Sequence, residues 1–296
     1  MNVLITGSTG QLGKSLIALK PSNVTITAPT RKELDLSNIE SCYKTILEIK
    51  GDWIINCGAY TAVDKAEIEI EKAKKINGFA LKGFTEGLNK TNGNILQIST
   101  DFVFNGKQNF PYLENQNRSP LNVYGVSKSI GEEFIENNIK NKKKATILRT
   151  SWVISPHSKN FVLTILKLHS EKKSINVVSD QIGVPTSAKD LAKVCWRIIK
   201  FKEKKNLPLI MQWSDAGVAS WYDLAVAIGE IGLEIGLLKK QAKVFPIKSS
   251  QYPTPAVRPK YSILDTTNTS RILEIEPTYW RVNLKKILLE YKHLQN

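Results

Sequence analysis

The stretch that most limits what this chain can fold into is its N-terminus. An apolar run at residues 2–6 leads into Gly7, Gly10 and Gly13, spaced Gly-x-x-Gly-x-x-Gly, and then into an amphipathic stretch through about Lys20. In this setting Gly7 permits a tight turn, Gly10 lets a pyrophosphate approach the backbone, and Gly13 allows a helix to pack closely on the strand. The order of strand, glycine loop and helix predicts a dinucleotide-binding α/β unit built on a doubly wound parallel sheet.

Apolar runs and helical patterns alternate through the first half of the chain. Each strand is expected to be buried on both faces, as in a parallel sheet. Further strands are expected at 24–28, 53–57, 94–98 and 145–148, and helices at 38–50, 62–88 and from about 124 to 138. We expect Ser37 to cap the helix at 38–50, and Asn77 to be an ordinary exposed residue of the helix at 62–88.

The regular alternation loosens after residue 150. Helices are expected near 160–171, 188–201, 221–236 and 282–292, with a strand at 175–178. A proline-rich stretch at 252–259 cannot be regular structure and is expected to be a loop. We therefore expect residues 1–150 to form mainly the cofactor-binding domain. Residues 151–296 are expected to form mainly a smaller substrate-binding part, with some segments returning to the first domain.

The end of the second strand bears on the choice of cofactor. An acidic residue there favours NAD, and a nearby arginine favours NADP. Here the strand runs into Arg31 and Lys32, with no acid before Glu33. We expect NADPH, with Arg31 on its 2′-phosphate, and NADH as a possible second cofactor. The alternative is that Arg31 and Lys32 only begin a solvated turn. Asp35, a little further on, is placed to contact the adenine.

Tyr124 and Lys128 lie four residues apart, which places both side chains on one face of a helix. A free tyrosine has a pKa of about 10 and is a reluctant proton donor near neutral pH. A neighbouring ammonium favours the phenolate, so Lys128 is expected to lower that pKa. Such a phenol can protonate a carbonyl oxygen while hydride reaches its carbon. A lone Tyr-x-x-x-Lys pair also occurs by chance, so the catalytic interpretation of this pair depends on the glycine loop that precedes it.

Polar and small residues follow the third and fourth strands, where the ligand crevice of such a sheet lies. Residues 58–61 follow the third strand, and Ser99, Thr100 and Asp101 follow the fourth. We interpret the hydroxyls and the carboxylate as a site, with the Ser99–Thr100 pair as the hydroxyl neighbour of Tyr124. Arg258, in the proline-rich loop, either contacts an anionic ligand or is a surface residue without a role in binding.

Composition excludes several classes of function. The formal charge is +15, from 42 basic and 27 acidic residues, but the lysines are scattered and lack interleaved aromatic residues. We therefore expect no nucleic-acid partner, although nucleic acid stays an alternative. Three distant cysteines and three histidines show no metal-ligand spacing, so no metal is expected, and a reducing cytoplasm fits. The chain has no signal-peptide pattern and no apolar run of about 18 residues, so no membrane span is expected.

Taken together, these segments resemble the extended short-chain dehydrogenase/reductase family, and within it the dTDP-4-dehydrorhamnose reductases. The resemblance covers nearly the whole chain and is carried by residues 7–13, 59–67, 99–104, 120–125, 149–152, 180–186 and 252–256. It implies a Rossmann-type fold and NADPH-dependent reduction of the C4 keto group of dTDP-4-dehydro-L-rhamnose to give dTDP-L-rhamnose. The implied place is dTDP-rhamnose biosynthesis in the cytoplasm.

The resemblance also implies roles for individual residues. Tyr124 is the proton donor, Lys128 its partner and a ligand of the nicotinamide ribose, and Thr100 completes the triad. Substrate contacts fall on Thr100, Asp101, Trp152 and, less directly, Arg258 for the diphosphate. Cofactor contacts fall on Gly7, Gly10, Gln11, Leu12, Gly13, Arg31, Asp35, Leu36, Ala59, Tyr60, Thr61, Ile98, Tyr124 and Lys128.

The sequence departs from the family pattern at three places. A glutamate that helps hold magnesium between the subunits of some members is replaced by Ser15, so we expect a monomer or a homodimer without a bridging metal. Trp213 stands where a histidine is common, and residues 260–262 differ from the usual continuation of the late loop. The alternatives to a reductase are another nucleotide-sugar epimerase or dehydratase, or a non-catalytic subunit resembling the regulator of methionine adenosyltransferase.

Overall fold

The computed structural model describes residues 1–202 and 205–295, and its N-terminal half is built on a six-stranded sheet. Every neighbouring pair of these strands runs parallel. In spatial order the strands are β10 (Ile210–Gln212), β5 (Ala145–Thr150), β4 (Asn94–Thr100), β3 (Trp53–Asn56), β1 (Asn2–Thr6) and β2 (Thr25–Thr27). The predicted parallel α/β sheet is confirmed.

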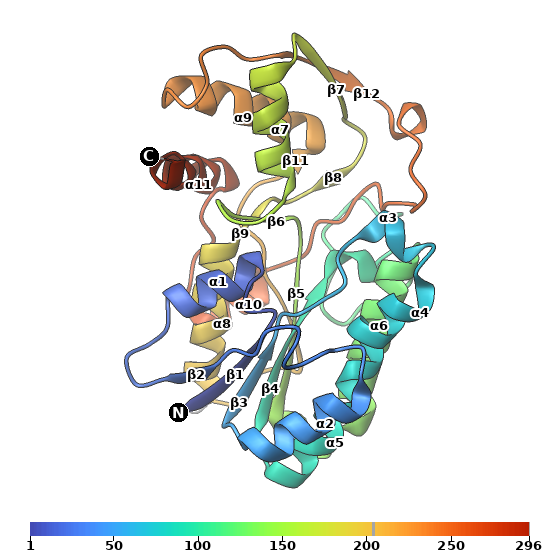
Figure 1. The fold of residues 1–296 in the computed structure, drawn as a ribbon. Coiled ribbons are helices and arrows are strands. Elements are labelled where there is room, and N and C mark those ends of the chain that lie inside the picture. Colours follow the sequence, from blue (N-terminus) through green and yellow to red (C-terminus); the bar gives the residue numbers. More distant parts are fainter. Residues whose placement is uncertain (203–204, 296) are drawn as a thin grey trace.

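Helices cover both faces of the sheet (Figure 1). One face carries α1 (Gln11–Ala18), α8 (Ala188–Lys202) and α10 (Thr267–Leu273); the other carries α2 (Ile39–Ile49), α5 (Ala80–Thr91) and α6 (Val123–Asn138). Alternate residues of β1 serve the two layers, because successive side chains of a strand point to opposite faces. Val3 and Ile5 pack in the α1–α8 core, whereas Leu4 packs in the α2–α5 core. The three central residues of β1 are therefore all apolar.

The chain leaves β1 toward β2 on one side and returns to β3 on the other. Ligands of open α/β sheets bind at such a reversal, at the carboxyl ends of the strands. Gly7 begins the loop there with φ of 63°, a value that favours glycine. At Gly13 a Cβ atom would lie 2.3 Å from the carbonyl oxygen of Gly7. Both glycines have the backbone roles that the sequence predicts.

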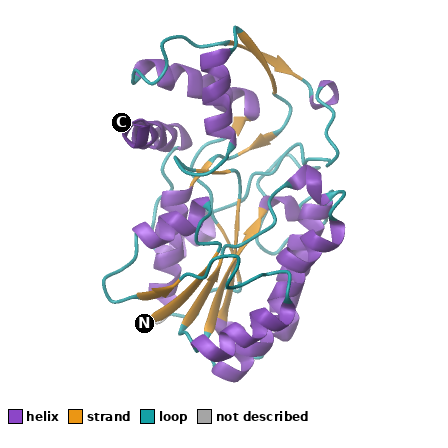
Figure 2. Ribbon diagram, viewed as in Figure 1, coloured by secondary structure: helices purple, strands orange, loops and turns teal. Residues whose placement is uncertain are grey.

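A second core holds the C-terminal elements, drawn at the top of Figure 2. The helices α7 (Phe161–Glu171), α9 (Trp221–Glu234) and α11 (Trp280–Gln295) share apolar contacts through Val162, Ile228 and Leu284. Short strand pairs join these helices: β7 (Ser174–Val178) with β12 (Lys243–Ile247), β8 (Ile182–Gly183) with β11 (Ala219–Ser220), and β6 (Val153–Ile154) with β9 (Thr186–Ser187). Helices α8 and α10 and strand β10 come from the C-terminal half of the chain but pack on the first core. The division into two domains near residue 150 stays a prediction.

Two local predictions are wrong. Ser37 does not cap α2, because the Asn38 side chain accepts the hydrogen bond from the Ser41 amide. The long helix expected at 62–88 is divided into α3 (Val63–Ala66), α4 (Ile70–Lys74), a π-helical segment at Lys75–Phe79, and α5. The sequence did not predict strands β6, β8, β9, β10, β11 and β12 or helix α10. No helix in the described part of the chain combines the length and apolar character needed to span a bilayer.

Candidate active site

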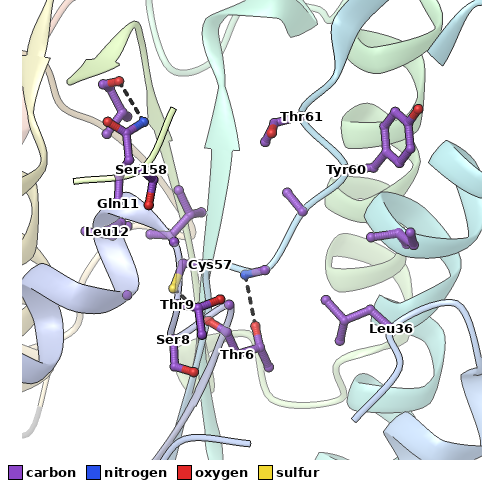
Figure 3. Close-up of a pocket in the computed structure, with 18 of the residues that line it drawn as sticks. Thr6, Ser8, Thr9, Gln11, Leu12, Leu36, Cys57, Tyr60, Thr61 and Ser158 are labelled. Carbon is purple, nitrogen blue, oxygen red and sulfur yellow. Dashed lines mark hydrogen bonds between the residues drawn. The ribbon is translucent and has the colours of Figure 1, made fainter. Parts of the chain in front are cut away.

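A cavity of about 570 Å³ opens at the carboxyl ends of the central strands. Figure 3 shows its two walls: Gln11, Leu12 and Ser158 lie on one side, and Leu36, Tyr60 and Thr61 on the other. Of the residues predicted for the site, the following line it: Gly7, Gly10, Gln11, Leu12, Gly13, Arg31, Asp35, Leu36, Ala59, Tyr60, Thr61, Ile98, Thr100, Asp101, Tyr124, Lys128 and Trp152. The fold thus brings segments from six parts of the sequence to one cavity.

The glycine-loop wall is tied to the C-terminal elements by one side chain. Gln11 Nε2 donates to the carbonyl oxygen of Val153 at 3.1 Å, and Gln11 Oε1 accepts from Ser155 Oγ at 2.9 Å and from Asn160 Nδ2 at 3.0 Å. Asn160 in turn caps α7. Since the Gln11 side chain is engaged in this way, its backbone amide at the start of α1 is the group left to meet an anion.

The opposite wall depends on Asn77, which is buried and not exposed as expected. Its side chain accepts from the Tyr60 amide at 2.8 Å and donates to the Tyr60 carbonyl oxygen at 3.0 Å and to Ser127 Oγ at 2.9 Å. The residue lies in the π-helical segment, a distortion often found at functional sites. Asn77 therefore fixes residues 59–61 against α6. A polar residue between Ile76 and Gly78, inside an otherwise apolar stretch, was the signal for it.

Tyr124 enters the cavity from the first turn of α6. Asn122 caps this helix by accepting a hydrogen bond from the Gly125 amide at 2.8 Å. Burial raises the pKa of Tyr124 to about 12, while a hydrogen bond with the Thr100 side chain opposes the rise and the charge of Asp101 adds to it. The expected lowering of this pKa is therefore wrong for the protein without a cofactor. The phenol stays protonated through the neutral range.

Lys128 lies on the same face of α6, one turn beyond Tyr124. Its Nζ donates to the carbonyl oxygen of Ile98 at 2.7 Å, at the end of β4. Burial lowers the pKa of Lys128 to about 8, and the charge of Glu132 opposes this shift. The Lys128 ammonium is thus held at the carboxyl end of β4 by a backbone carbonyl oxygen.

A buried ion pair beneath these residues was not predicted. Glu132, one further turn along α6, is fully buried and accepts from Arg149 Nε at 3.0 Å and Nη2 at 2.7 Å. It also accepts from Ser99 Oγ at 2.5 Å and from Arg118 Nη1 at 3.0 Å. These bonds join α6 to β4 and β5 next to the cavity. The sequence offered one signal that Glu132 belongs near the site: it lies four residues after Lys128, on the same face of the helix.

Asp101 follows Thr100 at the end of β4 and is only 2% exposed. Thr100 Oγ1 donates to Asp101 Oδ1 at 3.0 Å. Burial raises the pKa of the Asp101 carboxyl to about 6, against hydrogen bonds from Ser262 and Thr100 that lower it. The cavity therefore holds a carboxyl with a raised pKa directly beside the Thr100 hydroxyl.

Trp152 lies where β5 leaves the sheet, with φ of 39°. For a bulky residue this left-handed conformation is strained, and strained residues of this kind cluster at functional sites. Its ring stacks on that of Trp221 with centroids 3.5 Å apart and planes 5° apart. Trp152 thus joins the wall of the cavity to the first turn of α9.

The far end of the cavity carries opposite charges. Arg31 lines it with Pro29 and Thr30 just after β2, and the side chain of Arg31 is exposed. Asp35 accepts a hydrogen bond from the Ser37 amide at 2.9 Å, and this bond lowers its pKa, with the charge of Arg31 as a smaller cause. A cation free in solvent and a carboxylate lie together at the place predicted for an adenosine.

Arg258 does not line this cavity. Its Nη1 and Nη2 donate to Asp64 Oδ1 at 3.0 Å and Oδ2 at 2.7 Å, in the bidentate arrangement that suits a guanidinium and a carboxylate. Asp64 belongs to α3, and the neighbouring carbonyl oxygen of Val257 accepts from Asn122 Nδ2 at 2.8 Å. The proline-rich loop is therefore fastened to α3 and to the cap of α6.

Reversing one charge of the Asp64–Arg258 pair tests this fastening. We expect Arg258→Asp to lower the free energy of unfolding by about 1–2 kcal/mol, since it replaces a charge-assisted bond by repulsion. The double variant Asp64→Arg with Arg258→Asp should recover most of the loss in urea unfolding. A double variant no more stable than the singles would contradict a direct pair.

Three comparisons place the chain among known proteins. The family model described as RmlD substrate binding domain matches residues 1–293. The spore coat polysaccharide biosynthesis protein SpsK of Bacillus subtilis (strain 168) is 37% identical, over 97% of both chains. A dTDP-4-dehydrorhamnose reductase of Aggregatibacter actinomycetemcomitans is also 37% identical, over 96% of this chain and 97% of that protein.

Solved structures agree with this placement. A dTDP-4-dehydrorhamnose reductase of Clostridium acetobutylicum ATCC 824 superposes with a TM-score of 0.89 at 34% identity, over the full length of both chains. One from Bacillus anthracis str. Ames, in complex with NADP, has a TM-score of 0.88 at 34% identity and covers 98% of this chain and 99% of that one. A UDP-glucose 4-epimerase of Thermotoga maritima, 17% identical with a TM-score of 0.82, shares the fold alone. The chain belongs to the RmlD substrate binding domain family, as its resemblance to the extended short-chain dehydrogenase/reductases predicts.

Proposed function

We propose that this protein is an NADPH-dependent reductase that converts the C4 keto group of dTDP-4-dehydro-L-rhamnose into a hydroxyl, giving dTDP-L-rhamnose. The observation that carries the proposal is the meeting of Thr100, Tyr124 and Lys128 on one wall of a cavity whose other end holds the glycine loop. Relatives of nearly equal length that are named dTDP-4-dehydrorhamnose reductase support the choice of substrate.

The chemistry follows from the arrangement of the side chains. The bound reduced nicotinamide supplies hydride to the carbonyl carbon. Tyr124, protonated through the neutral range, gives its proton to the carbonyl oxygen. Lys128 is close enough on the same helix face to stabilise the phenolate that remains, and Thr100 orients the phenol. Burial around these three residues strengthens each interaction, because the local dielectric constant is low.

The preference for NADPH rests on Arg31. No acidic residue lies between β2 and Arg31 to accept a hydrogen bond from the 2′-hydroxyl of NADH, and Arg31 lines the cavity at that end. The solved relative from Bacillus anthracis is in complex with NADP. A guanidinium suits a phosphate because it can donate two parallel hydrogen bonds.

Replacing Arg31 with alanine tests this preference. The variant should raise the KM for NADPH about tenfold or more and leave that for NADH almost unchanged, since a bond to a charged group contributes about 1.5–3 kcal/mol. Steady-state kinetics with each cofactor measure the ratio. Lys32→Ala is the matched control, because Lys32 is exposed and does not line the cavity. Equal changes for the two cofactors would contradict the role of Arg31.

The activity itself is tested by mixing the purified protein with dTDP-4-dehydrorhamnose, made in place from its precursor, and following the absorbance of NADPH and of NADH. We expect rapid oxidation, faster with NADPH. Absence of oxidation in protein shown to bind NADPH would contradict the proposal and favour an epimerase or dehydratase, which recycles its cofactor, or a regulatory subunit. Cytoplasmic location, absence of nucleic-acid binding, absence of a metal, and a monomeric or homodimeric state stay predictions.

A further inference from the structure

The Gln11 side chain joins two parts of the cavity wall that are far apart in the sequence. Its backbone belongs to the glycine loop at the start of α1, whereas its side-chain partners, Val153, Ser155 and Asn160, all precede α7. Within the described part of the chain, no other side chain of residues 7–13 forms a hydrogen bond with residues 153–160. The glycine loop therefore holds this segment through a single side chain.

The segment at residues 155–160 is a compact turn built around the same side-chain amide. The Ser155 hydroxyl accepts from the His157 backbone amide at 3.1 Å, and Asn160 Nδ2 donates to the Ser155 carbonyl oxygen at 2.9 Å. Asn160 Oδ1 accepts from the Leu163 amide at 3.1 Å, which caps α7. The two side chains that hold the turn together are thus also the ones that contact the glycine loop.

The turn forms part of the cavity wall. Val153, Ser158 and Lys159 line the cavity, and Ser158 lies on the same wall as Gln11 (Figure 3). Ser158 has φ of 64°, a left-handed value that is uncommon for a residue other than glycine, and strain of this kind clusters at functional sites. Trp152, a predicted substrate contact, directly precedes this segment. The stretch next to a predicted substrate contact is therefore held in place from the glycine loop.

The backbone and the side chain of Gln11 have different partners. The backbone amide, at the N-terminus of α1, is placed to meet the pyrophosphate of a dinucleotide, while the side chain holds residues 153–160. An anion that orders the first turn of α1 also orders the side chain that leaves it. A second ligand that contacts residues 153–160 then meets a segment already in place, and its binding costs less conformational entropy.

We propose that Gln11 is a positioning residue that couples the two ligands of the cavity. Cofactor bound at the glycine loop fixes residues 153–160 through the Gln11 side chain, and the sugar nucleotide then binds more tightly. The inference rests on the proposed function for the identity of the two ligands. It adds a favourable coupling between them, which by thermodynamic linkage acts equally in both directions.

Gln11→Met tests the link, since methionine has nearly the size of glutamine, keeps the backbone amide and removes the three side-chain bonds. Ser15→Ala is the matched control. Ser15 Oγ donates to the Gln11 carbonyl oxygen at 3.1 Å within α1, so its loss leaves the link to residues 153–160 intact. Amide hydrogen exchange with and without NADPH, followed by mass spectrometry, reports the local opening of each segment.

In the wild type and in Ser15→Ala, we expect NADPH to slow exchange at residues 7–13 and also at 153–164. In Gln11→Met, we expect slowing at residues 7–13 alone. Equal slowing at 153–164 in Gln11→Met would overturn the inference, because the cofactor would then fix this segment without Gln11. Exchange at 153–164 that NADPH leaves unchanged in the wild type would overturn it as well. Absence of slowing at residues 7–13 in the wild type would contradict the proposed cofactor site, and the inference with it.

The coupling itself is the ratio of the dissociation constants for dTDP-L-rhamnose without and with NADPH, two reduced molecules that do not react with each other. Titration calorimetry should give a ratio of about five or more in the wild type and in Ser15→Ala, and about one in Gln11→Met. A purely structural role of Gln11 would leave the ratio unchanged, and that result would overturn the inference. Wild-type protein that binds NADPH but not dTDP-L-rhamnose would count against the proposed substrate, while the exchange at residues 153–164 still decides the link.

Discussion

Replacing Tyr124 with phenylalanine is expected to abolish most turnover while the protein still binds NADPH. The change removes the hydroxyl that we assign as proton donor, and loss of a positioned acid costs about 10²–10⁴-fold in rate. The aromatic ring itself has a structural contact, an edge-to-face arrangement with Phe102 at 5.7 Å between centroids, which phenylalanine keeps. The fold and the cofactor site should therefore survive the substitution.

The measurement is kcat with saturating NADPH, together with the dissociation constant for NADPH from fluorescence. Tyr252→Phe is the matched control, since Tyr252 is 59% exposed and lies outside the cavity. Turnover by Tyr124→Phe at more than about a tenth of the wild-type rate would contradict its role as proton donor. Loss of NADPH binding would mean that the Tyr124 hydroxyl is required to hold the cofactor and not only to supply the proton.

Arg149→Met is expected to cause the largest loss of stability. Arg149 is 1% exposed and Glu132 fully buried, and methionine would remove both of the guanidinium bonds to Glu132. Breaking a buried ion pair by removing one partner costs about 3–5 kcal/mol, because a charge is left in the interior. This is a large part of the 5–15 kcal/mol that typically holds a domain folded.

Urea unfolding measures the effect, and two controls define its cause. The double variant Arg149→Met with Glu132→Gln replaces the buried Glu132 carboxylate by a neutral amide and should recover much of the stability. The surface pair of Arg281 and Glu230, 40% and 48% exposed, should cost under about 1 kcal/mol when Arg281 is replaced by methionine. If Arg149→Met costs no more than this surface variant, the buried pair has little effect on stability.

Local patterns account for the parts of the fold that were predicted. The strands of the central sheet are apolar on both faces, and the glycine loop needs backbone conformations that few other residues adopt, so both are visible in short windows of sequence. The cavity was predictable in outline, because the carboxyl ends of parallel strands meet at one edge. Residues 59–61 and 99–101 were named for that reason, and both segments line the cavity.

Contacts between distant residues account for what was not predicted. Glu132 meets Arg149, Asp64 meets Arg258, and Gln11 meets Asn160, and no local pattern tells which partner each will find. The prediction of a lowered pKa for Tyr124 was wrong for a related reason: it counted the charge of Lys128 but not the burial of the phenol. Strand β10 has three residues, too few for a periodic pattern to appear.

The central claim, hydride transfer to C4 of the sugar with a proton from the protein, is tested most directly by isotope transfer. NADPH carrying deuterium at the transferable position of its nicotinamide is mixed with the protein and dTDP-4-dehydrorhamnose, and the product is analysed by NMR. The account predicts one deuterium on C4 of dTDP-L-rhamnose for each NADPH oxidised, and none with Tyr124→Phe. Deuterium at another carbon, or a product without deuterium and an unchanged cofactor, would contradict it.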